Sequence, residues 1–242
     1  MASVCSMGDS FSFRQFTVRQ DRTAMKVGTD GVLLGAWARG GQRVLDIGCG
    51  TGVVALMMAQ RFPKAEVTGI DIDRDASEQA RQNACESPFA ERVKIFNESL
   101  QSFGNEYCCK FDSIVCNPPF FVRSLGSPDR QRSLARHDSS LPLSDLFRCA
   151  ARLLTAEGEM SIVLPFDRLA DARAEAVFAG LYEVRLCRVS TVEGKAPKRV
   201  LVAFGKAPVE SVEQQDVTMM TSERKRSQWL SELTRDFYLD EK

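Results

Sequence analysis

The sequence has no excess of charge of one sign, since lysine and arginine together number 32 and aspartate and glutamate together also number 32. Overall charge therefore gives no reason to expect nucleic-acid or membrane binding, and any basic surface must be local. Long apolar runs are also missing. No stretch is long enough to span a bilayer, and the N-terminus lacks the apolar segment of a secretion signal.

Paired cysteine spacing is missing as well. The chain has 8 cysteines but no Cys-x-x-Cys pair. Its single histidine, His137, cannot complete a zinc site alone. The sequence thus predicts no metal site, and a reduced, cytoplasmic compartment is the simplest expectation.

Repeats and linkers are absent, and 242 residues fit one domain. We expect an N-terminal hairpin and lid helix over 1–40, a core over 41–206, and a tail with a helix over 207–242. Apolar strands are expected at 43–47, 66–70, 93–97, 111–116, 159–164, 182–189 and 199–204, and helices at 51–62, 74–84, 143–154 and 167–179. This alternation predicts an α/β fold with a seven-stranded, mostly parallel sheet, an antiparallel last strand, and helices on both faces.

The segments outside this series carry weaker patterns. Alternation from Phe11 predicts a short hairpin. A helix is expected over 31–38 with Thr29 or Asp30 as its N-cap, and a final helix is expected after a cap at Ser222. Residues 106–110 are predicted to form a loop, and 209–221 a polar tail.

Residues 43–52 join a buried strand to a helix through glycines at every second position. Gly48, Gly50 and Gly52 let a ligand approach bare backbone, with free N–H groups at the start of the helix. Asp46 and Cys49 lie in the same turn. A nicotinamide site is one interpretation, but its Gly-x-Gly-x-x-Gly spacing differs from the Gly-x-Gly-x-Gly found here.

Polar residues follow the next two strands of the predicted sheet. Asp71, with Ile72 beside it, comes about twenty residues after the glycine turn, where an acid can accept both hydroxyls of a ribose. Asn97, Glu98 and Ser99 come at the end of the third strand and are suited to lie against an adenine ring. Asp46 is placed to face a cationic amino-acid group.

Together, Asp46-Ile-Gly-Cys-Gly-Thr-Gly52 and Gly69-Ile-Asp71 resemble the S-adenosylmethionine site of class I methyltransferases, over roughly residues 43–205. The resemblance implies a Rossmann-like fold and that methyl donor.

The fourth strand runs into Asn117-Pro118-Pro119-Phe120. Two prolines remove two N–H donors, so this backbone offers only carbonyl groups. The side-chain oxygen of Asn117 and the carbonyl of Pro118 can both accept from one planar amino group, and Phe120 can stack on the ring that bears it. Such acceptors favour the pyramidal nitrogen that attacks a methyl group and stabilise its developing positive charge.

Similar tetrads occur in enzymes that methylate adenine N6, guanine N2 or glutamine. Outside the tetrad, the chain resembles one bacterial family, the tRNA adenine-N6 methyltransferases that modify the adenosine at position 37 beside the anticodon of valine tRNA. The resemblance rests on Phe11-Ser-Phe-Arg-Gln-Phe, Asp21-Arg22, Met25-Lys-Val-Gly-Thr-Asp30 and Ala135-Arg-His137. It implies tRNA as the partner, and a 26–30 segment that closes over the donor, with Lys26 and Asp30 as further donor-site candidates. We expect a monomer.

One local feature agrees with an RNA partner, because positive charge gathers after the tetrad and in a later loop. The expected substrate-binding residues are Pro119, Phe121, Arg123, Arg136, His137, Lys195, Lys198 and Arg199. Two alternatives remain open at this point: guanine-N2 methylation of ribosomal RNA, and a non-catalytic RNA-binding protein with a vestigial nucleotide site.

Overall fold

The predicted alternation of strands and helices is confirmed by a computed structural model, which describes residues 9–23, 25–106, 110–118 and 141–239. One eight-stranded sheet has the order β10-β8-β9-β7-β6-β3-β4-β5. The strands are β3 (Arg43–Ile47), β4 (Glu66–Asp71), β5 (Val93–Asn97), β6 (Phe111–Cys116), β7 (Leu154–Pro165), β8 (Tyr182–Val192), β9 (Arg199–Gly205) and β10 (Glu213–Met220). β9 is antiparallel to both of its neighbours, and the other pairs are parallel.

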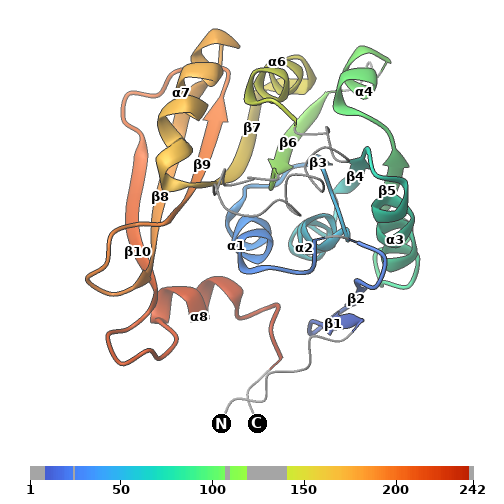
Figure 1. Ribbon diagram of the computed structural model, residues 1–242. Coiled ribbons are helices and arrows are strands. Elements are labelled where there is room, and N and C mark those ends of the chain that lie inside the picture. The colour runs from blue at the N-terminus through green and yellow to red at the C-terminus, as the bar shows by residue number, and fades with distance from the viewer. Residues whose placement is uncertain (1–8, 24, 107–109, 119–140, 240–242) are drawn as a thin grey trace, which may run out of the picture.

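Helices cover both faces of this sheet (Figure 1). The helices are α1 (Thr29–Trp37), α2 (Val53–Arg61), α3 (Arg74–Cys85), α4 (Leu100–Glu106), α6 (Leu143–Leu153), α7 (Leu169–Phe178) and α8 (Gln228–Thr234). Two apolar clusters fill the two interfaces, one beneath α1 and α2 and the other beneath α6 and α7. The sheet is therefore buried on both sides, as its apolar strands require.

The register of the parallel strands decides where the polar strand ends meet. Asp46 pairs with Gly69, Asp71 pairs with Asn97, and Ile47 pairs with Cys116. The residues that follow β3, β4, β5 and β6 therefore emerge at one edge of the sheet, which is where open α/β sheets bind ligands.

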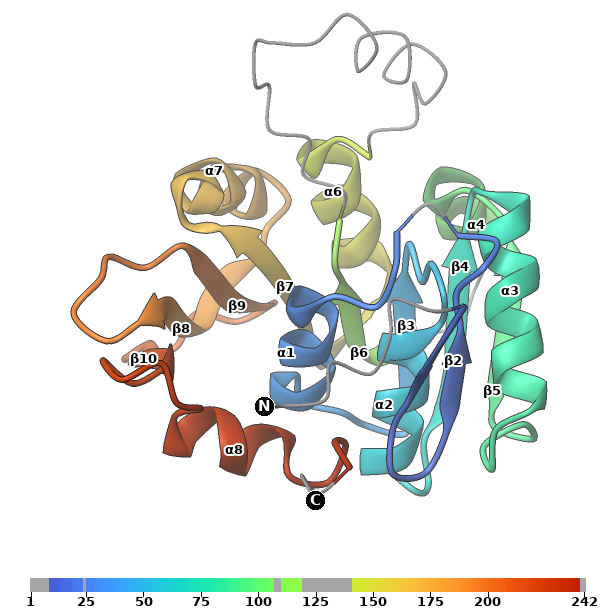
Figure 2. The same cartoon turned by 60° about the horizontal axis from the view of Figure 1, so that its bottom comes forward.

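The predicted N-terminal hairpin is confirmed, with β1 (Ser10–Ser12) antiparallel to β2 (Thr17–Arg19). Figure 2 shows it beside α3. Asn83 of α3 is fully buried, and its side-chain amide donates to the carbonyls of Arg19 and Thr51. One side chain thus ties the hairpin to the glycine turn.

Three expectations about local structure were wrong, and one helix was not predicted. Gly28, without a side-chain cap, precedes α1 in place of Thr29 or Asp30, and Ser227 rather than Ser222 caps α8. Helix α4 precedes the predicted 106–110 loop, and most of the predicted polar tail forms β10, an eighth strand paired in parallel with β8.

Candidate active site

The glycine turn after β3 adopts a backbone that only glycine takes without strain. Gly48, Gly50 and Gly52 have φ angles of 67°, 55° and 80°, in the left-handed region. A Cβ atom built on Gly48 or Gly50 would meet nothing within 4 Å. The turn therefore leaves open space above its backbone, as the approach of a ligand requires.

The N–H groups of this turn are already used by the protein. Gly48 and Cys49 donate to the carbonyl of Ile70, at 2.9 and 3.0 Å. Gly50 donates to the Asp71 carboxylate at 2.8 Å, and Gly52 donates to the carbonyl of Cys49. These four N–H groups, which precede α2, are therefore not free to bind a ligand. A pyrophosphate needs such donors, so the turn does not favour a nicotinamide dinucleotide.

Asp46 is buried at the end of β3, where its carboxylate accepts a hydrogen bond from the Ala55 N–H at 3.0 Å. Burial raises the pKa of this carboxyl group to about 7, because the charged form loses its solvation. Burial also raises the pKa of the Cys49 and Cys116 thiols well above their usual range. Neither cysteine is thus a thiolate nucleophile.

Asp71 lies at the end of β4 with both carboxylate oxygens directed by the backbone. One oxygen accepts from Gly50, and the other accepts from the Asp73 N–H at 2.9 Å. Beside it, Ile72 is 60% exposed, which is unusual for an aliphatic side chain next to a buried strand. An acid beside a bare apolar surface fits a ribose and its adenine ring.

Residues after β5 support this strand end. The Asn97 side chain donates to the carbonyls of Asp71 and Ile72 at 3.0 and 3.1 Å. The hydroxyl of Ser99, a predicted donor-site residue, accepts from the Ser102 N–H at the start of α4, and Glu98 is half-buried between them. The sequence suggested Asn97 only as a neighbour of the adenine ring, and did not predict that its side chain holds the backbone of Asp71.

A cavity of about 710 Å³ lies at the same edge of the sheet. It brings together six residues predicted separately for donor binding, catalysis and RNA binding: Lys26, Asp30, Asn117, Pro118, Lys198 and Arg199. Lys195 is exposed on the β8–β9 loop but does not line this cavity. The remaining predicted residues lie outside the described part of the chain: Pro119, Phe120, Phe121, Arg123, Arg136 and His137.

Some polar groups in this cavity have a hydrogen-bond or ion-pair partner in the protein, and others do not. The guanidinium of Arg199 pairs with the Asp30 carboxylate at 2.9 Å, and this ion pair joins α1 to β9. The carboxamide of Asn117 makes no hydrogen bond with any other described residue. Because Pro118 is buried directly after it, Asn117 is held at the cavity wall with its polar atoms available.

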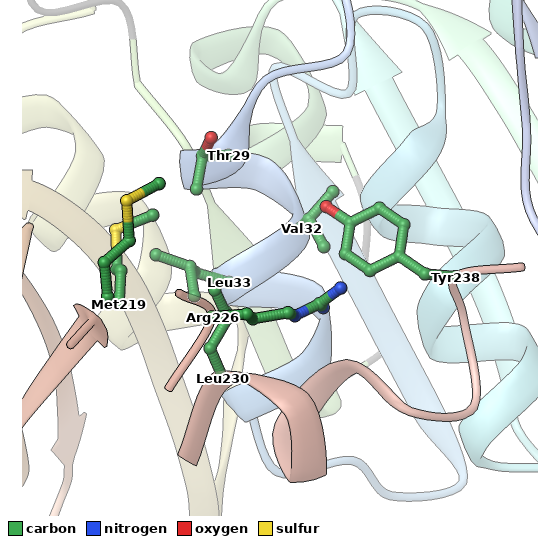
Figure 3. Close-up of a pocket in the computed structure, with 8 residues that line it drawn as sticks. Thr29, Val32, Leu33, Met219, Arg226, Leu230 and Tyr238 are labelled. Carbon is green, nitrogen blue, oxygen red and sulfur yellow. The ribbon is translucent and has the colours of Figure 1, made fainter. Parts of the chain in front are cut away.

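A second, smaller cavity of about 230 Å³ lies between α1, β10 and α8 (Figure 3). Its walls are mostly apolar, and its one charged side chain, Arg226, reaches toward Tyr238. The guanidinium carbon of Arg226 lies 4.7 Å from the centre of the Tyr238 ring, and Arg226 also donates a hydrogen bond to Thr234. These contacts indicate packing between elements.

Among the residues that the structure describes, no group of three histidine, cysteine, aspartate or glutamate side chains is arranged to hold a metal ion. No helix there combines the length and the hydropathy needed to cross a membrane.

The fold and the strand-end residues define a class I methyltransferase, whose methyl donor is S-adenosylmethionine. Residues 27–185 match the methyltransferase small domain family. Among solved structures, a predicted O-methyltransferase from Agrobacterium tumefaciens is similar with a TM-score of 0.64, at 19% identity over 86% of this chain and 96% of that one. The CcbJ methyltransferase of Streptomyces caelestis is similar with a TM-score of 0.53, at 14% identity over 75% and 97% of the two chains. These likenesses agree with the fold.

Sequence relatives narrow the class to one family. Proteins named tRNA1(Val) (adenine(37)-N6)-methyltransferase are 43% identical in Parabacteroides distasonis, over 95% of this chain and 97% of the relative. They are 50% identical in Porphyromonas gingivalis, over 80% and 79%, and 41% identical in Tolumonas auensis, over 96% and 98%. The chain belongs to the tRNA1(Val) (adenine(37)-N6)-methyltransferase family, which confirms the resemblance inferred from its motifs.

Proposed function

We propose that this protein transfers the methyl group of S-adenosylmethionine to N6 of the adenine at position 37, beside the anticodon of valine tRNA. The observation that carries this proposal is the unsatisfied carboxamide of Asn117, held next to Pro118 at the end of β6 in the large cavity. The names of the relatives supply the substrate. We further propose that the enzyme acts as a monomer in the cytoplasm.

The target nitrogen needs help because its lone pair is delocalised into the adenine ring. In our proposal, the amino group donates to the side-chain oxygen of Asn117 and to the carbonyl of Pro118. Two acceptors outside the ring plane favour a pyramidal nitrogen, and their dipoles stabilise the charge that develops as the nitrogen is alkylated. The proton leaves after transfer, so no strong base is required. Phe120, two residues after Pro118, is assigned to stack on the base.

S-adenosylmethionine supplies an electrophilic methyl group on a sulfonium. The residues proposed to hold it are those that surround the open glycine turn. Asp71 accepts from the ribose hydroxyls, and Ile72 lies against the adenine ring. The carboxylate of Asp46 would compensate the positive charge of the ammonium in the amino-acid group. Lys26, beside Asp30 in the large cavity, borders the donor from the side of α1. These residues would hold the donor in the orientation that in-line attack on its methyl group requires.

An adenine beside the anticodon is unpaired, so it can enter a pocket without the opening of a duplex. Lys198 and Arg199 line the cavity that would receive it, and Lys195 stands on the same loop. We assign these three residues, with Arg123, Arg136 and His137, to contacts with the RNA backbone. Such contacts give affinity and salt dependence rather than sequence choice.

Nucleoside mass spectrometry tests this function directly. Purified protein is incubated with S-adenosylmethionine and with either bulk tRNA or ribosomal RNA from cells lacking the enzyme. The expected product is N6-methyladenosine in valine tRNA, mapped to position 37 by nuclease fragments. N2-methylguanosine in ribosomal RNA would instead support the guanine alternative. Donor binding without transfer to any RNA would contradict enzymatic activity.

A further inference from the structure

Phe166 is an exposed aromatic side chain in the cavity that Asn117 lines. It follows β7 directly, in a short 3-10 helix, η1 (Phe166–Arg168), and 40% of its surface is exposed. It lines the large cavity together with Asn117 and Pro118. Exposure of a large apolar ring to water costs free energy. A ligand that covered the ring would recover this free energy.

The backbone of Phe166 is fixed against the loop that carries the cationic residues. Its N–H donates to the carbonyl of Lys198 at 3.1 Å, and the preceding residue, Pro165, pairs with Arg199 across β7 and β9. Phe166, Lys198 and Arg199 are thus neighbours at the end where β7 and β9 pair. The ammonium of Lys198 is exposed and forms no ion pair with a described residue.

An aromatic face beside a fixed cation matches the chemistry of a nucleotide, whose base stacks and whose phosphate is anionic. The cavity volume of about 710 Å³ lies in the range of sites that enclose ligands larger than one base, roughly 300 to 1,000 Å³. The Asn117 end of the cavity is assigned to the target adenine. The Phe166 end, on the neighbouring strand, therefore has room for a second base.

We propose that Phe166 is a positioning residue whose ring stacks on an unpaired base next to the target adenine, while Lys198 contacts the phosphate between the two nucleotides. This inference rests on the proposed function, because it assumes an RNA substrate. It goes further in assigning recognition of a flanking nucleotide to η1 and the β8–β9 loop. Stacking of this neighbour restrains the backbone, and so directs the target amino group toward Asn117.

The protein side of the test compares Phe166→Ala and Phe166→Tyr with Phe178→Ala. Phe178 is a matched control because it is 87% exposed at the far end of α7 and does not line the cavity. With an anticodon stem-loop RNA, we expect Phe166→Ala to lower kcat/KM by about 5- to 100-fold, mainly through KM. Phe166→Tyr and Phe178→Ala should keep wild-type values. Donor affinity by calorimetry and the melting temperature should be unchanged in all three.

The RNA side of the test removes one base at a time. Stem-loops with an abasic nucleotide on the 5′ or the 3′ side of the target adenine are methylated by wild type and by Phe166→Ala. We expect one of the two abasic substrates to be impaired with wild type, and to cause no further loss with Phe166→Ala, because the stacking partner is already missing. Equal losses for both proteins with both substrates would overturn the inference.

The same assays separate this inference from the proposed function. If wild type methylates no adenine in the intact stem-loop or in tRNA, the proposed function fails. If wild type is active and Phe166→Ala matches it on every substrate, only the flanking-base inference fails. The inference would also be overturned if Phe166→Ala lowered the melting temperature or abolished donor binding, and if Phe166→Tyr failed to restore the kinetics. Those results would show that Phe166 has a structural role.

Discussion

Helix α1 separates two cavities, and Thr29 lines both of them. In the larger cavity, the carboxamide of Asn117 and the ammonium of Lys26 have no partner among the described residues. In the smaller cavity, the guanidinium of Arg226 is committed to Tyr238 and Thr234 (Figure 3). The Asn117 carboxamide is half-buried, and a half-buried polar group costs free energy unless it is paired. The unpaired carboxamide of Asn117 therefore points to a ligand, whereas the contacts of Arg226 point to a structural role.

The largest effect that tests this comparison is expected at Asn117. Asn117→Ala should lower kcat by at least about 100-fold, since it removes an acceptor for the developing charge. Donor binding, measured by calorimetry, should stay close to wild type. Asn117→Asp is the matched variant, because it keeps an acceptor oxygen, and it should lose less. Parallel loss of catalysis and donor binding would contradict the assignment of Asn117 to the substrate amine.

Asp71 should affect donor binding rather than the reaction itself. Asp71→Ala is expected to weaken S-adenosylmethionine binding by about 10- to 100-fold, because it removes charged acceptors for the ribose. Asp71→Asn keeps one carbonyl oxygen and should show a smaller loss. Calorimetric titration measures both. An unchanged dissociation constant for Asp71→Ala would remove this carboxylate from the donor site.

Donor affinity should depend on pH through Asp46, whose pKa is raised to about 7 by burial. A cationic ligand group favours the ionised carboxylate, so binding at lower pH must expel a proton. Affinity should therefore rise by about tenfold from about pH 6 to about pH 8, and Asp46→Asn should flatten this dependence. The same raised pKa lowers the free energy of unfolding as pH rises from about 4 to about 7, since the unfolded carboxyl group ionises first.

Periodicity was enough to predict the strands around the glycine turn, because β3, β4 and β6 are apolar runs buried on both faces. Helix α4 was missed because its seven residues include Gly104 and gain their stability from packing against α6. Strand β10 was missed because its residues are mostly polar and half-exposed, and pairing with β8 stabilises it. Tertiary contacts decide such segments, and local sequence does not carry them.

The candidate site shows the same limit. Asp46, Asp71 and Asn117 were predictable because each follows or ends a recognisable strand. The role of Asp30 was not predictable. It was expected as a possible cap of α1, but it pairs with Arg199, which lies 169 positions away in the sequence. Phe166 was missed because a phenylalanine after an apolar strand is typical of a core residue. Its exposure becomes visible only once β7 and β9 are paired.

The smaller cavity should respond in stability and not in activity. Arg226→Met removes a cation–π contact and a hydrogen bond, and should lower the free energy of unfolding by about 1 to 2 kcal/mol. Arg224→Met is the control, because Arg224 is exposed in the same turn and forms no ion pair with a described residue. Chemical denaturation measures stability, and methylation of tRNA measures activity. If Arg226→Met were fully folded but lost most of its activity, the structural role assigned to the smaller cavity would be wrong.

The smallest effect is expected at Lys198, which lines the larger cavity without a described ion-pair partner. Lys198→Gln should weaken tRNA binding by about 3- to 10-fold and reduce the slope of log affinity against log salt by about 1, because one phosphate contact is lost. Lys64→Gln is the matched control, since Lys64 is exposed just before β4, at the opposite edge of the sheet. Filter binding over a salt series measures both. If Lys198→Gln and Lys64→Gln gave the same slope of log affinity against log salt, the charge of Lys198 would act on the RNA only at long range. The assignment of a phosphate contact to the larger cavity would then be wrong, while the assignment of Asn117 to the target amine would stand.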